Sequence, residues 1–492
     1  MAAAKRPIKI RSGFASSDPV PRPTACLETT DSTTFRQSAT FLVLDLATMA
    51  RDPQAQLARL ANQFIRQNQG ILDQFGVLAE MAYDGSNVDL IFRTSTRIGA
   101  LPLVSPKSGR PDFGLVIQPR FGWQGIGPML SEMGWRIIPQ PLRLPMLPRS
   151  DRKIPPWVLS TIVLLRLRAL LDRLQRRFEF SEADCRAPRG SVRWAEYATE
   201  RLPLARFLSV PCRFPDLRDD QELKAAIHFA LRRQLLSLDG QRQSGIVVLR
   251  LIDLCLALVE RVRQITPKEP GRRRIQSWQR GPLKQEVFLS GVQAIEWTVE
   301  GNGLAGLSDL QGLPWIMSME EFFEAWVETI FARVTRHSGG QLRVGRKRET
   351  ISPILWNPPY VGSQKYLLPD MVLERENETL IIDAKFKGHR EELQRERWGA
   401  LDEVLRENHR ADLLQVLAYS TVATSQTISS CLVYPCTLPT WEFLKREGRI
   451  VHRGSLRAGS RNVGLLLADV PMVARLDEIA TELEKSIFGE RE

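Results

Sequence analysis

Residues 366–388 read YLLPDMVLERENETLIIDAKFKG and constrain the fold more than any other part of the chain. Two runs rich in β-forming residues flank the polar stretch RENE, which is the pattern of a β-hairpin. A turn centred on Glu376 and Asn377 predicts that Asp370 faces Asp383 across the two strands. Side chains directly opposite each other have Cβ atoms about 5 Å apart. The hairpin therefore brings two carboxylates together.

Two facing carboxylates repel each other unless a cation lies between them or one of them is protonated. A divalent cation is the simplest solution. Because side chains alternate along a strand, Lys385 lies on the same face as both carboxylates, whereas Ile382 and Ala384 point to the other face. The alternative is a partly exposed strand whose charged residues face water, and this segment alone leaves both interpretations open.

The chain of 492 residues is too long for a single core and predicts about three domains. Its best apolar stretch, residues 157–165, ends at Arg166 and is shorter than the ~20 residues of a membrane span. Lys5 and Arg6 are followed by no hydrophobic run, so we expect no secretory signal. We therefore expect a cytoplasmic protein.

The cysteines and histidines show no spacing typical of a metal site. The six cysteines contain no C-x-x-C pair, and the five histidines contain no H-E-x-x-H motif. This pattern argues against a zinc site and against a disulfide framework.

The net charge of +12 is concentrated in one section. Between Pro139 and Arg280 there are 28 Lys and Arg against 15 Asp and Glu, a surplus of 13, so the rest of the chain is close to neutral. Such a surplus favours binding to a polyanion through phosphate contacts. The alternative is that these residues, 25 of them Arg, line solvated helix faces.

The patterns along the chain predict a multidomain α+β protein. We expect a mobile tail over residues 1–40, a β-rich domain over 41–138, a Pro-rich linker over 139–156, a basic helical domain over 157–314 and an α/β domain over 315–492. The β-rich domain begins with the strand-like FLVLDL of residues 41–46. Helices are predicted over residues 158–178, 220–238 and 246–265.

A helix is predicted to begin at Ser318, which forms a capping box with Glu321. Glu324 falls at the border of the apolar stripe of this helix, from where its carboxylate can reach a neighbouring sheet. The alternative is a surface glutamate that faces water together with Glu320 and Glu328, four residues away on either side.

A second helix is predicted in RADLLQVLAYST, with Leu413 and Val416 on its inner face. Asp412, Gln415 and Tyr419 form a polar stripe on a neighbouring face of the same helix. This stripe has little meaning by itself, but it follows the hairpin in the sequence.

The order of these residues resembles the PD-(D/E)XK nuclease superfamily: Glu324 on a helix, Asp370 and Asp383-x-Lys385 on a hairpin, and Gln415 on a following helix. The segments EEFFEAWV, PDMVL, IIDAKFK and ADLLQVLAY resemble McrC, the nuclease subunit of McrBC-type restriction systems. LVIQPRFGWQGIGPML and CRFPDLRDDQELKAAIHFAL are more weakly similar to McrC. The resemblance implies a mixed sheet flanked by helices, with the active site at its first hairpin.

The resemblance also implies an activity, which is Mg²⁺-dependent DNA endonuclease activity in antiviral defence, with Mn²⁺ as a substitute. Asp370 and Asp383 are the expected metal ligands, and the Ala384 carbonyl is a further ligand implied by the family. Glu324 is the expected outer ligand. Lys385 is expected to orient or deprotonate the attacking water and to neutralise the scissile phosphate.

Gln415 and Tyr419 are expected to be accessory residues that position the phosphate or brace the hairpin. Their order in the sequence agrees with this role, because they follow Lys385 on the next predicted helix. Neither side chain is expected to take part in the chemistry itself.

The resemblance implies a separate AAA+ GTPase or ATPase partner. PRFGWQGIGPML is the expected contact with it, although Phe121 and Trp123 are equally compatible with a core position. The chain itself has no credible NTPase site, because GQLRVGRK of residues 340–347 has Arg346 where a P-loop needs Lys and lacks the following Ser or Thr. A competing hypothesis is a noncatalytic DNA-binding adaptor that stimulates an AAA+ motor protein.

Overall fold

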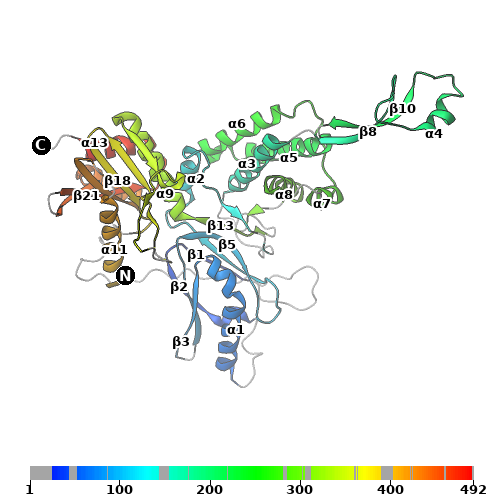
Figure 1. Cartoon of the computed structure of the whole chain (residues 1–492). Helices are drawn as coiled ribbons and strands as arrows, with labels where there is room; N and C mark the ends of the chain where they lie inside the picture. Colours follow the sequence, from blue (N-terminus) through cyan, green and yellow to red (C-terminus); the bar gives the residue numbers. More distant parts are fainter. Residues whose placement is uncertain are drawn as a thin grey trace. The chain divides into compact units, whose positions relative to one another are not determined.

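The computed structural model shows a mixed α+β protein (Figure 1). The chain separates into two compact units, one of residues 1–155 with 304–492 and the other of residues 156–303. None of the described helices is long and apolar enough to cross a membrane. The structure describes residues 25–43, 52–85, 87–142, 144, 155–174, 177–218, 220–280, 285–301, 303–304, 312–358, 362, 364–388, 403–421, 423, 425–458 and 461–489.

Two sheets form the N-terminal part of the first unit. One has the strand order β1-β6-β5-β13-β7 and the other has the order β2-β4-β3. Their strands are β1 (Ala25–Thr30), β2 (Thr34–Ser38), β3 (Leu78–Asp84), β4 (Asn87–Arg93), β5 (Arg97–Leu103), β6 (Phe113–Gln118), β7 (Gln140–Pro141) and β13 (Trp315–Ser318).

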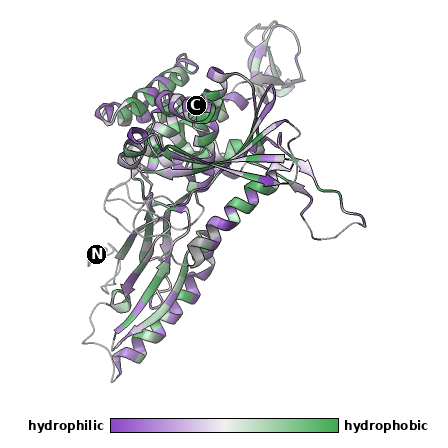
Figure 2. Cartoon of the chain, turned by 90° about the vertical axis from the view of Figure 1, so that its left-hand side faces the viewer, coloured by the Kyte–Doolittle hydropathy of each residue, from purple (hydrophilic) through white to green (hydrophobic). Residues whose placement is uncertain are grey.

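Helix α1 (Pro53–Gln74) covers the second of these sheets. Asp52 caps the helix by accepting a hydrogen bond from the Ala55 N–H, and Pro53 occupies the first turn, where its missing N–H costs nothing. Hydrophilic and hydrophobic residues alternate along α1 in Figure 2, as expected of a helix with one buried face. Phe64 on that face makes edge-to-face contacts with Phe41 and Phe113.

The mobile tail predicted for residues 1–40 is wrong for its second part. Residues 25–38 form β1 and β2, and β1 pairs in parallel with β6. Ala25 and Leu27 alternate into the core, so the strand gains its stability from a distant partner that the polar local sequence does not reveal. Residues 1–24 lie outside the described residues.

The strand predicted from FLVLDL is also wrong. Ala39–Leu42 form a 3₁₀ turn, because the Ser38 side chain accepts a hydrogen bond from the Thr40 N–H and caps it. Residues 44–50 lie outside the described residues.

Strand β13 joins two regions that the sequence analysis assigns to different domains. It pairs antiparallel with β5, with Trp315 opposite Ala100, and it leads directly into α9 (Met319–Ser338). Gly99 allows this pairing because a Cβ atom there would overlap the Trp315 carbonyl oxygen. The sheet β1-β6-β5-β13-β7, which we call the N-terminal sheet, and the C-terminal region are therefore parts of one unit.

The C-terminal part of the first unit is built on a six-stranded mixed sheet with the order β14-β17-β18-β19-β21-β20. The pairs β18 with β19 and β19 with β21 are parallel, and the other pairs are antiparallel. Its strands are β14 (Gln341–Val344), β17 (Met371–Arg375), β18 (Glu378–Ala384), β19 (Thr427–Cys436), β20 (Val451–Ala458) and β21 (Arg461–Pro471). A short pair, β15 (Ser352–Pro353) and β16 (Tyr366–Leu367), precedes the hairpin.

Helices α9, α11 (Glu403–Ser420), α12 (Leu438–Arg446) and α13 (Leu476–Phe488) pack on this sheet. Val372 and Ile381 pack with Val416 of α11, whereas Met371 and Ile382 point the other way and are buried too. Both faces are thus covered, as parallel strands require. The predicted hairpin register is confirmed, because Met371 pairs with Ile382.

The second unit contains the helices α3 (Trp157–Arg173), α5 (Gln221–Asp239), α6 (Ile246–Glu260), α7 (Arg272–Arg280) and α8 (Glu286–Glu300). The helices predicted over 158–178 and 246–265 exist but end earlier. After α3 the sequence RFEFSE changes from helical spacing to alternation, which favours a strand. That strand is β8 (Arg177–Cys185), which pairs antiparallel with β10 (Val210–Arg218) along its whole length.

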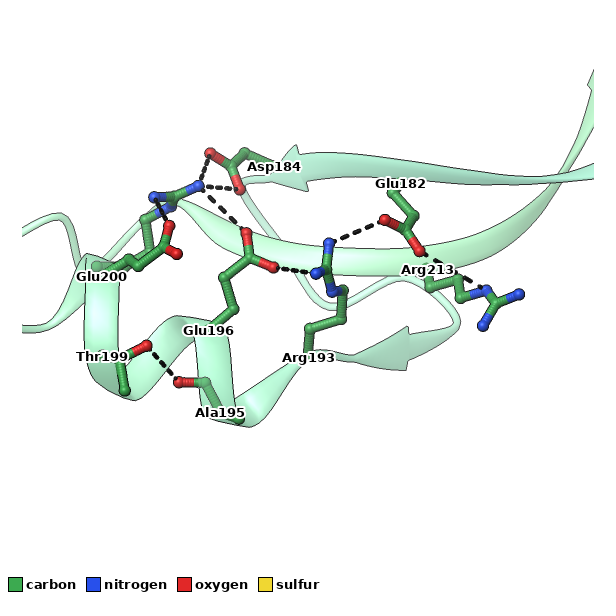
Figure 3. A network of polar contacts seen from close by, with 9 residues as sticks. Glu182, Asp184, Arg193, Ala195, Glu196, Thr199, Glu200 and Arg213 are labelled. Carbon is green, nitrogen blue, oxygen red and sulfur yellow. Dashed lines mark hydrogen bonds and ion pairs between the residues drawn. The ribbon is translucent and has the colours of Figure 1, made fainter.

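Strands β8 and β10, the short β9 (Ser191–Val192) and α4 (Trp194–Glu196) make a ribbon that we call the arm. Figure 3 shows an ion-pair network at its end. The Arg201 guanidinium lies 3.1 Å from Asp184 and 3.5 Å from Glu196, while Arg193 lies 2.9 Å from Glu182 and 2.7 Å from Glu196. These pairs hold the helical turn after α4 against the strands.

Gly99→Ala tests the β13 pairing. We expect it to lower the free energy of unfolding by about 1–3 kcal/mol, the usual cost of overpacking, because the new methyl group overlaps the Trp315 carbonyl. Gly70→Ala is the control, since a Cβ atom there meets nothing within 4 Å. We expect it to raise the free energy of unfolding by about 0.5–1 kcal/mol, because Ala has a higher helix propensity than Gly. Urea unfolding measures both, and an unchanged stability of Gly99→Ala would contradict the pairing.

Candidate active site

Asp370 lies at the start of β17, where three strands meet. Val344 of β14 pairs with Met371, and the next residue, Gly345, donates its N–H to the Asp370 carbonyl at 2.7 Å. A Cβ atom on Gly345 would lie 2.5 Å from the Pro369 carbonyl, so only glycine allows the chains to approach so closely. The backbone of Asp370 is therefore fixed from the β14 side.

The side chain of Asp370 is fixed from the β18 side. Its Oδ2 accepts a hydrogen bond from the Ala384 N–H at 2.8 Å. Asp383, the preceding residue, is 1% exposed, and the Lys385 Nζ lies 2.7 Å from its Oδ2. The structure thus brings Asp370, Asp383 and Lys385 together at one end of the hairpin, as the sequence predicts.

Helix α11 contributes the two predicted accessory residues. Lys385 Nζ donates a hydrogen bond to Gln415 Oε1 at 2.9 Å, and Gln415 Nε2 donates one to the Tyr419 hydroxyl at 2.8 Å. The four-residue spacing puts both side chains on the same face of the helix. Gln415 and Tyr419 therefore brace the lysine.

Glu324 of α9 lies at the edge of the same site. Burial raises its pKa, and the Asp383 carboxylate is among the charges that raise it further, whereas Arg346 at 3.6 Å lowers it. Of the alternative interpretation, in which Glu324 faces water with Glu320 and Glu328, only the exposure of Glu320 agrees with the structure, because Glu324 is half-buried. Glu328 is buried and forms ion pairs with Arg136 at 2.5 Å and with Arg346 at 2.7 Å.

The electrostatics of the hairpin acids reflect their crowding. Burial raises the pKa of Asp370 to about 8, and the charges of Asp383 and Glu324 contribute. Burial also raises the pKa of Asp383, although Lys385 opposes the shift. Burial lowers the pKa of Lys385, but the Asp383 and Asp370 carboxylates outweigh it, so its pKa is raised overall. At neutral pH the isolated site therefore favours a protonated Asp370 and a protonated Lys385.

The donor set fits a Mg²⁺ ion. The carboxylates of Asp370 and Asp383 offer hard oxygen donors, and Mg²⁺ in proteins commonly uses one or two carboxylates plus water and substrate phosphate. A bound cation would also relieve the repulsion from Asp383 and Glu324 that adds to the effect of burial on the pKa of Asp370. In the part of the chain that the structure describes, no three His, Cys, Asp or Glu side chains form a metal cluster. The metal-ligand roles of Asp370, Asp383, the Ala384 carbonyl and Glu324 therefore stay predictions.

A second lysine–aspartate pair lies beside the first and was not predicted. Lys387 Nζ lies 2.7 and 2.8 Å from the two carboxylate oxygens of Asp412, and the Tyr434 hydroxyl donates to Asp412 at 3.3 Å. Asp412 belongs to the predicted polar stripe of α11, but its partners are far away in the sequence. The short spacing between Lys385 and Lys387 was the only local signal.

Arg346 was not predicted either. In the sequence, its only recognisable feature is that it stands where a P-loop needs Lys. In the structure it follows β14 and forms ion pairs with Glu324 and Glu328. Only the pairing of β14 with β17 brings it to the site, and that pairing leaves no local sequence signal.

The motif PRFGWQGIGPML packs within the first unit. The Phe121 ring contacts Phe386 at a centroid distance of 5.9 Å, and the buried Trp123 contacts Trp315 at 5.8 Å. The core interpretation is thus confirmed for Trp123, whereas Phe121 is only half-buried, and the contact of this segment with a partner stays a prediction.

Comparisons with known proteins agree with these motifs. A family model described as McrBC 5-methylcytosine restriction system component matches residues 146–435. A structure of Thermococcus gammatolerans McrB AAA+ hexamers with bound McrC, a half-complex of a tetradecameric assembly, is 13% identical over 94% of this chain and 99% of that chain, with a TM-score of 0.42. A second structure of the McrBC complex from the same organism is 15% identical over 63% and 88% of the two chains, with a TM-score of 0.26. No curated protein matches the sequence.

Asp370→Asn tests the crowding of the acids. The pKa of Asp370 in the folded protein, about 8, exceeds the ordinary value of about 3.9, so its contribution to stability is full below pH 4 and is lost as the pH rises toward 8. In the presence of a chelator, we expect the free energy of unfolding of the variant to exceed that of the wild type by about 1–3 kcal/mol between pH 5 and 8.

Thermal unfolding at several pH values measures this gain. Glu374→Gln is the control, because Glu374 lies on the same hairpin but is partly exposed and paired with Arg343 at 2.6 Å. Parallel pH profiles of Asp370→Asn and the wild type would contradict the assignment.

Proposed function

Because the chain belongs to the family of McrBC 5-methylcytosine restriction system components, we propose that it is the nuclease subunit of such a system. It hydrolyses DNA phosphodiester bonds with Mg²⁺ and acts together with a separate AAA+ NTPase. The observation that carries the proposal is the convergence of Asp370, Asp383 and Lys385 at the end of the hairpin, with Gln415 behind the lysine.

The roles of the residues follow from their contacts. Asp370 and Asp383 would hold the metal ion, with the Ala384 carbonyl as the further ligand that the family resemblance implies, and the bound ion would supply a Lewis acid for the phosphoryl oxygen and for the attacking water. The raised pKa of Lys385 keeps its ammonium charged, so it neutralises the scissile phosphate rather than acting as a base in the resting protein. Gln415 accepts one of its hydrogen bonds and thereby points the ammonium toward the two acids.

DNA binding is assigned to the second unit, which carries most of the basic surplus. Some of its arginines form ion pairs, such as Arg261 with Asp172 at 2.7 Å and Arg242 with Asp239 at 2.6 Å. Internal pairs cannot remove the surplus, because only 15 acids face 28 bases between Pro139 and Arg280. The remaining charge supports contacts with phosphates.

The end of the arm is the surface that we assign to the AAA+ partner. Trp194, Phe207 and Leu208 are 65, 61 and 77% exposed, and an exposed apolar patch is typical of a protein interaction site. The ion-pair network of Figure 3 joins Arg193, the residue before Trp194, to Glu182 of β8, and such ordering of a surface before binding lowers the entropy cost of binding. The Thermococcus gammatolerans McrC occurs bound to McrB AAA+ hexamers, which supports a partner of this class.

Asp383→Asn tests the catalytic assignment and separates it from the adaptor hypothesis. We expect DNA cleavage, measured with Mg²⁺ and the AAA+ protein encoded nearby, to fall by more than about 100-fold, since even outer partners of metal ligands contribute 10- to 100-fold. DNA binding and stimulation of the NTPase should persist. Glu374→Gln should cut like the wild type. DNA cleavage by Asp383→Asn at the rate of the wild type would contradict the proposal and favour the adaptor hypothesis.

Trp194→Ala combined with Phe207→Ser tests the arm. We expect the affinity for the AAA+ partner to fall by about 10- to 100-fold, because a buried aromatic anchor contributes about 2 kcal/mol or more. The melting temperature should stay unchanged, since both side chains are exposed. Tyr83→Ala, which removes an exposed aromatic side chain from β3, is the matched control. Calorimetric titration measures the affinities. Equal affinities for the wild type, the double variant and Tyr83→Ala would show that the partner does not bind at the end of the arm.

A further inference from the structure

Phe386 lies between the two lysines of the site and has no role in the chemistry described above. It follows β18, and the Lys387 N–H donates to the Lys385 carbonyl at 2.8 Å, which closes a tight turn with Phe386 at its centre. The chain leaves the sheet at this turn, after a last bond from the Lys385 N–H to the Val433 carbonyl at 2.9 Å. The orientation of both lysines therefore depends on how the turn is held.

The Phe386 side chain is buried between two distant elements. Its ring contacts Phe323 of α9 at a centroid distance of 6.1 Å and Phe121 at 5.9 Å in an edge-to-face arrangement. The Arg120 guanidinium lies 4.5 Å from the ring centroid, within the range of a cation–π interaction. Three side chains from outside the hairpin thus hold one ring.

The Arg120 side of this contact is fixed in the N-terminal sheet. Asp31 follows β1 and Arg120 follows β6, and these strands are parallel neighbours. Asp31 is fully buried, accepts a hydrogen bond from the Arg120 N–H at 2.6 Å and lies 3.6 Å from the Arg120 Nε. The cation over the Phe386 ring is therefore anchored in the core of the N-terminal sheet.

We propose that Phe386 is a positioning residue through which the N-terminal sheet sets the two lysines of the site. With the ring held, Lys385 reaches Asp383 and Gln415, and Lys387 reaches Asp412. Without the contacts of the Phe386 ring, the turn can change its conformation. The ammonium groups of Lys385 and Lys387 can then each pair with either Asp383 or Asp412. The reaction then loses the oriented ammonium at the scissile phosphate. This inference rests on the proposed nuclease function for its kinetic consequence, but not for its structural one.

The structural consequence is tested without DNA. Full-length wild type, Phe386→Leu and Phe386→Ala are treated with trace acetic anhydride in the presence of a chelator, and the acetylation rates of Lys385 and Lys387 are read by mass spectrometry. We expect both rates to rise several-fold in Phe386→Ala and less in Phe386→Leu, which retains apolar volume. Rates of exposed lysines, such as Lys347, serve as the internal reference.

A double-mutant cycle tests the anchor. Arg120→Met removes the cation from the Phe386 ring without changing the hairpin itself. If Arg120 and Phe386 act through the same contact, the effects of Arg120→Met and Phe386→Leu on the acetylation rates of the two lysines should be non-additive. Phe64→Leu is the control, because Phe64 is equally buried and makes edge-to-face contacts, but with Phe41 and Phe113 away from the site. It should lower stability and leave both lysine rates unchanged.

The kinetic consequence is measured with the AAA+ partner and Mg²⁺. We expect Phe386→Leu to lower kcat by about 10- to 100-fold, as loss of an outer positioning partner does, with little change in the KM for DNA. Folded Phe386 and Arg120 variants with wild-type lysine rates and kcat would overturn the inference. A wild type that cuts no DNA but shows the expected lysine rates would overturn the proposed function and leave the anchor in place.

Discussion

The repulsion between the half-buried carboxylate of Asp370 and the buried carboxylate of Asp383 at one end of a hairpin is the constraint on which the candidate site depends. Two unit charges 5 Å apart in a medium of effective dielectric constant 20 repel by about 3 kcal/mol. That is a large fraction of the 5–15 kcal/mol that stabilises a typical domain. A pairing that places Asp370 opposite Asp383 is therefore tolerated only because other groups offset it, and the charge of Asp383 adds to the effect of burial in raising the pKa of Asp370 to about 8.

The compensating groups come from elements on several sides of the hairpin. Lys385 approaches Asp383 from the hairpin itself, and Gln415 of α11 holds the lysine in turn. Arg346, placed by β14, partly offsets the charge of Glu324. Lys387 and Asp412 form a neighbouring pair that is neutral as a whole. Charges of alternating sign thus surround the acids. The protein's own cations already offset part of the negative charge, and a divalent cation would neutralise the remainder.

The sequence was sufficient wherever the decisive interaction is local. The β-turn at Glu376 determines the hairpin register, and strand alternation places Lys385, so the centre of the site followed from one segment. The capping box at Ser318 likewise predicted the start of α9, where the Ser318 hydroxyl accepts from the Glu321 N–H. Such signals lie within a few residues of the feature that they determine.

The sequence was insufficient where the decisive partner is distant. Strand β1 looks like a polar tail until β6 pairs with it, and β13 looks like a linker to the C-terminal region until β5 pairs with it. Arg346 carried no signal because only the pairing of β14 with β17 brings it to Glu324. Propensity within a short window does not contain these contacts, which are set by tertiary packing.

Under the proposed function, the distribution of charge assigns cutting and DNA binding to different parts of the chain. The guanidinium of Arg346 at the candidate site already faces Glu324 and Glu328, and Lys385 and Lys387 face Asp383 and Asp412. Cations committed to nearby acids add little to the long-range attraction of a phosphate backbone, because each pair is nearly neutral beyond a Debye length of about 8 Å. A site that must hold a metal ion with carboxylates therefore cannot also supply the attraction for DNA. On the proposed function, the basic surplus of residues 139–280 supplies it, and this separation lets each part keep the charge that its own chemistry needs.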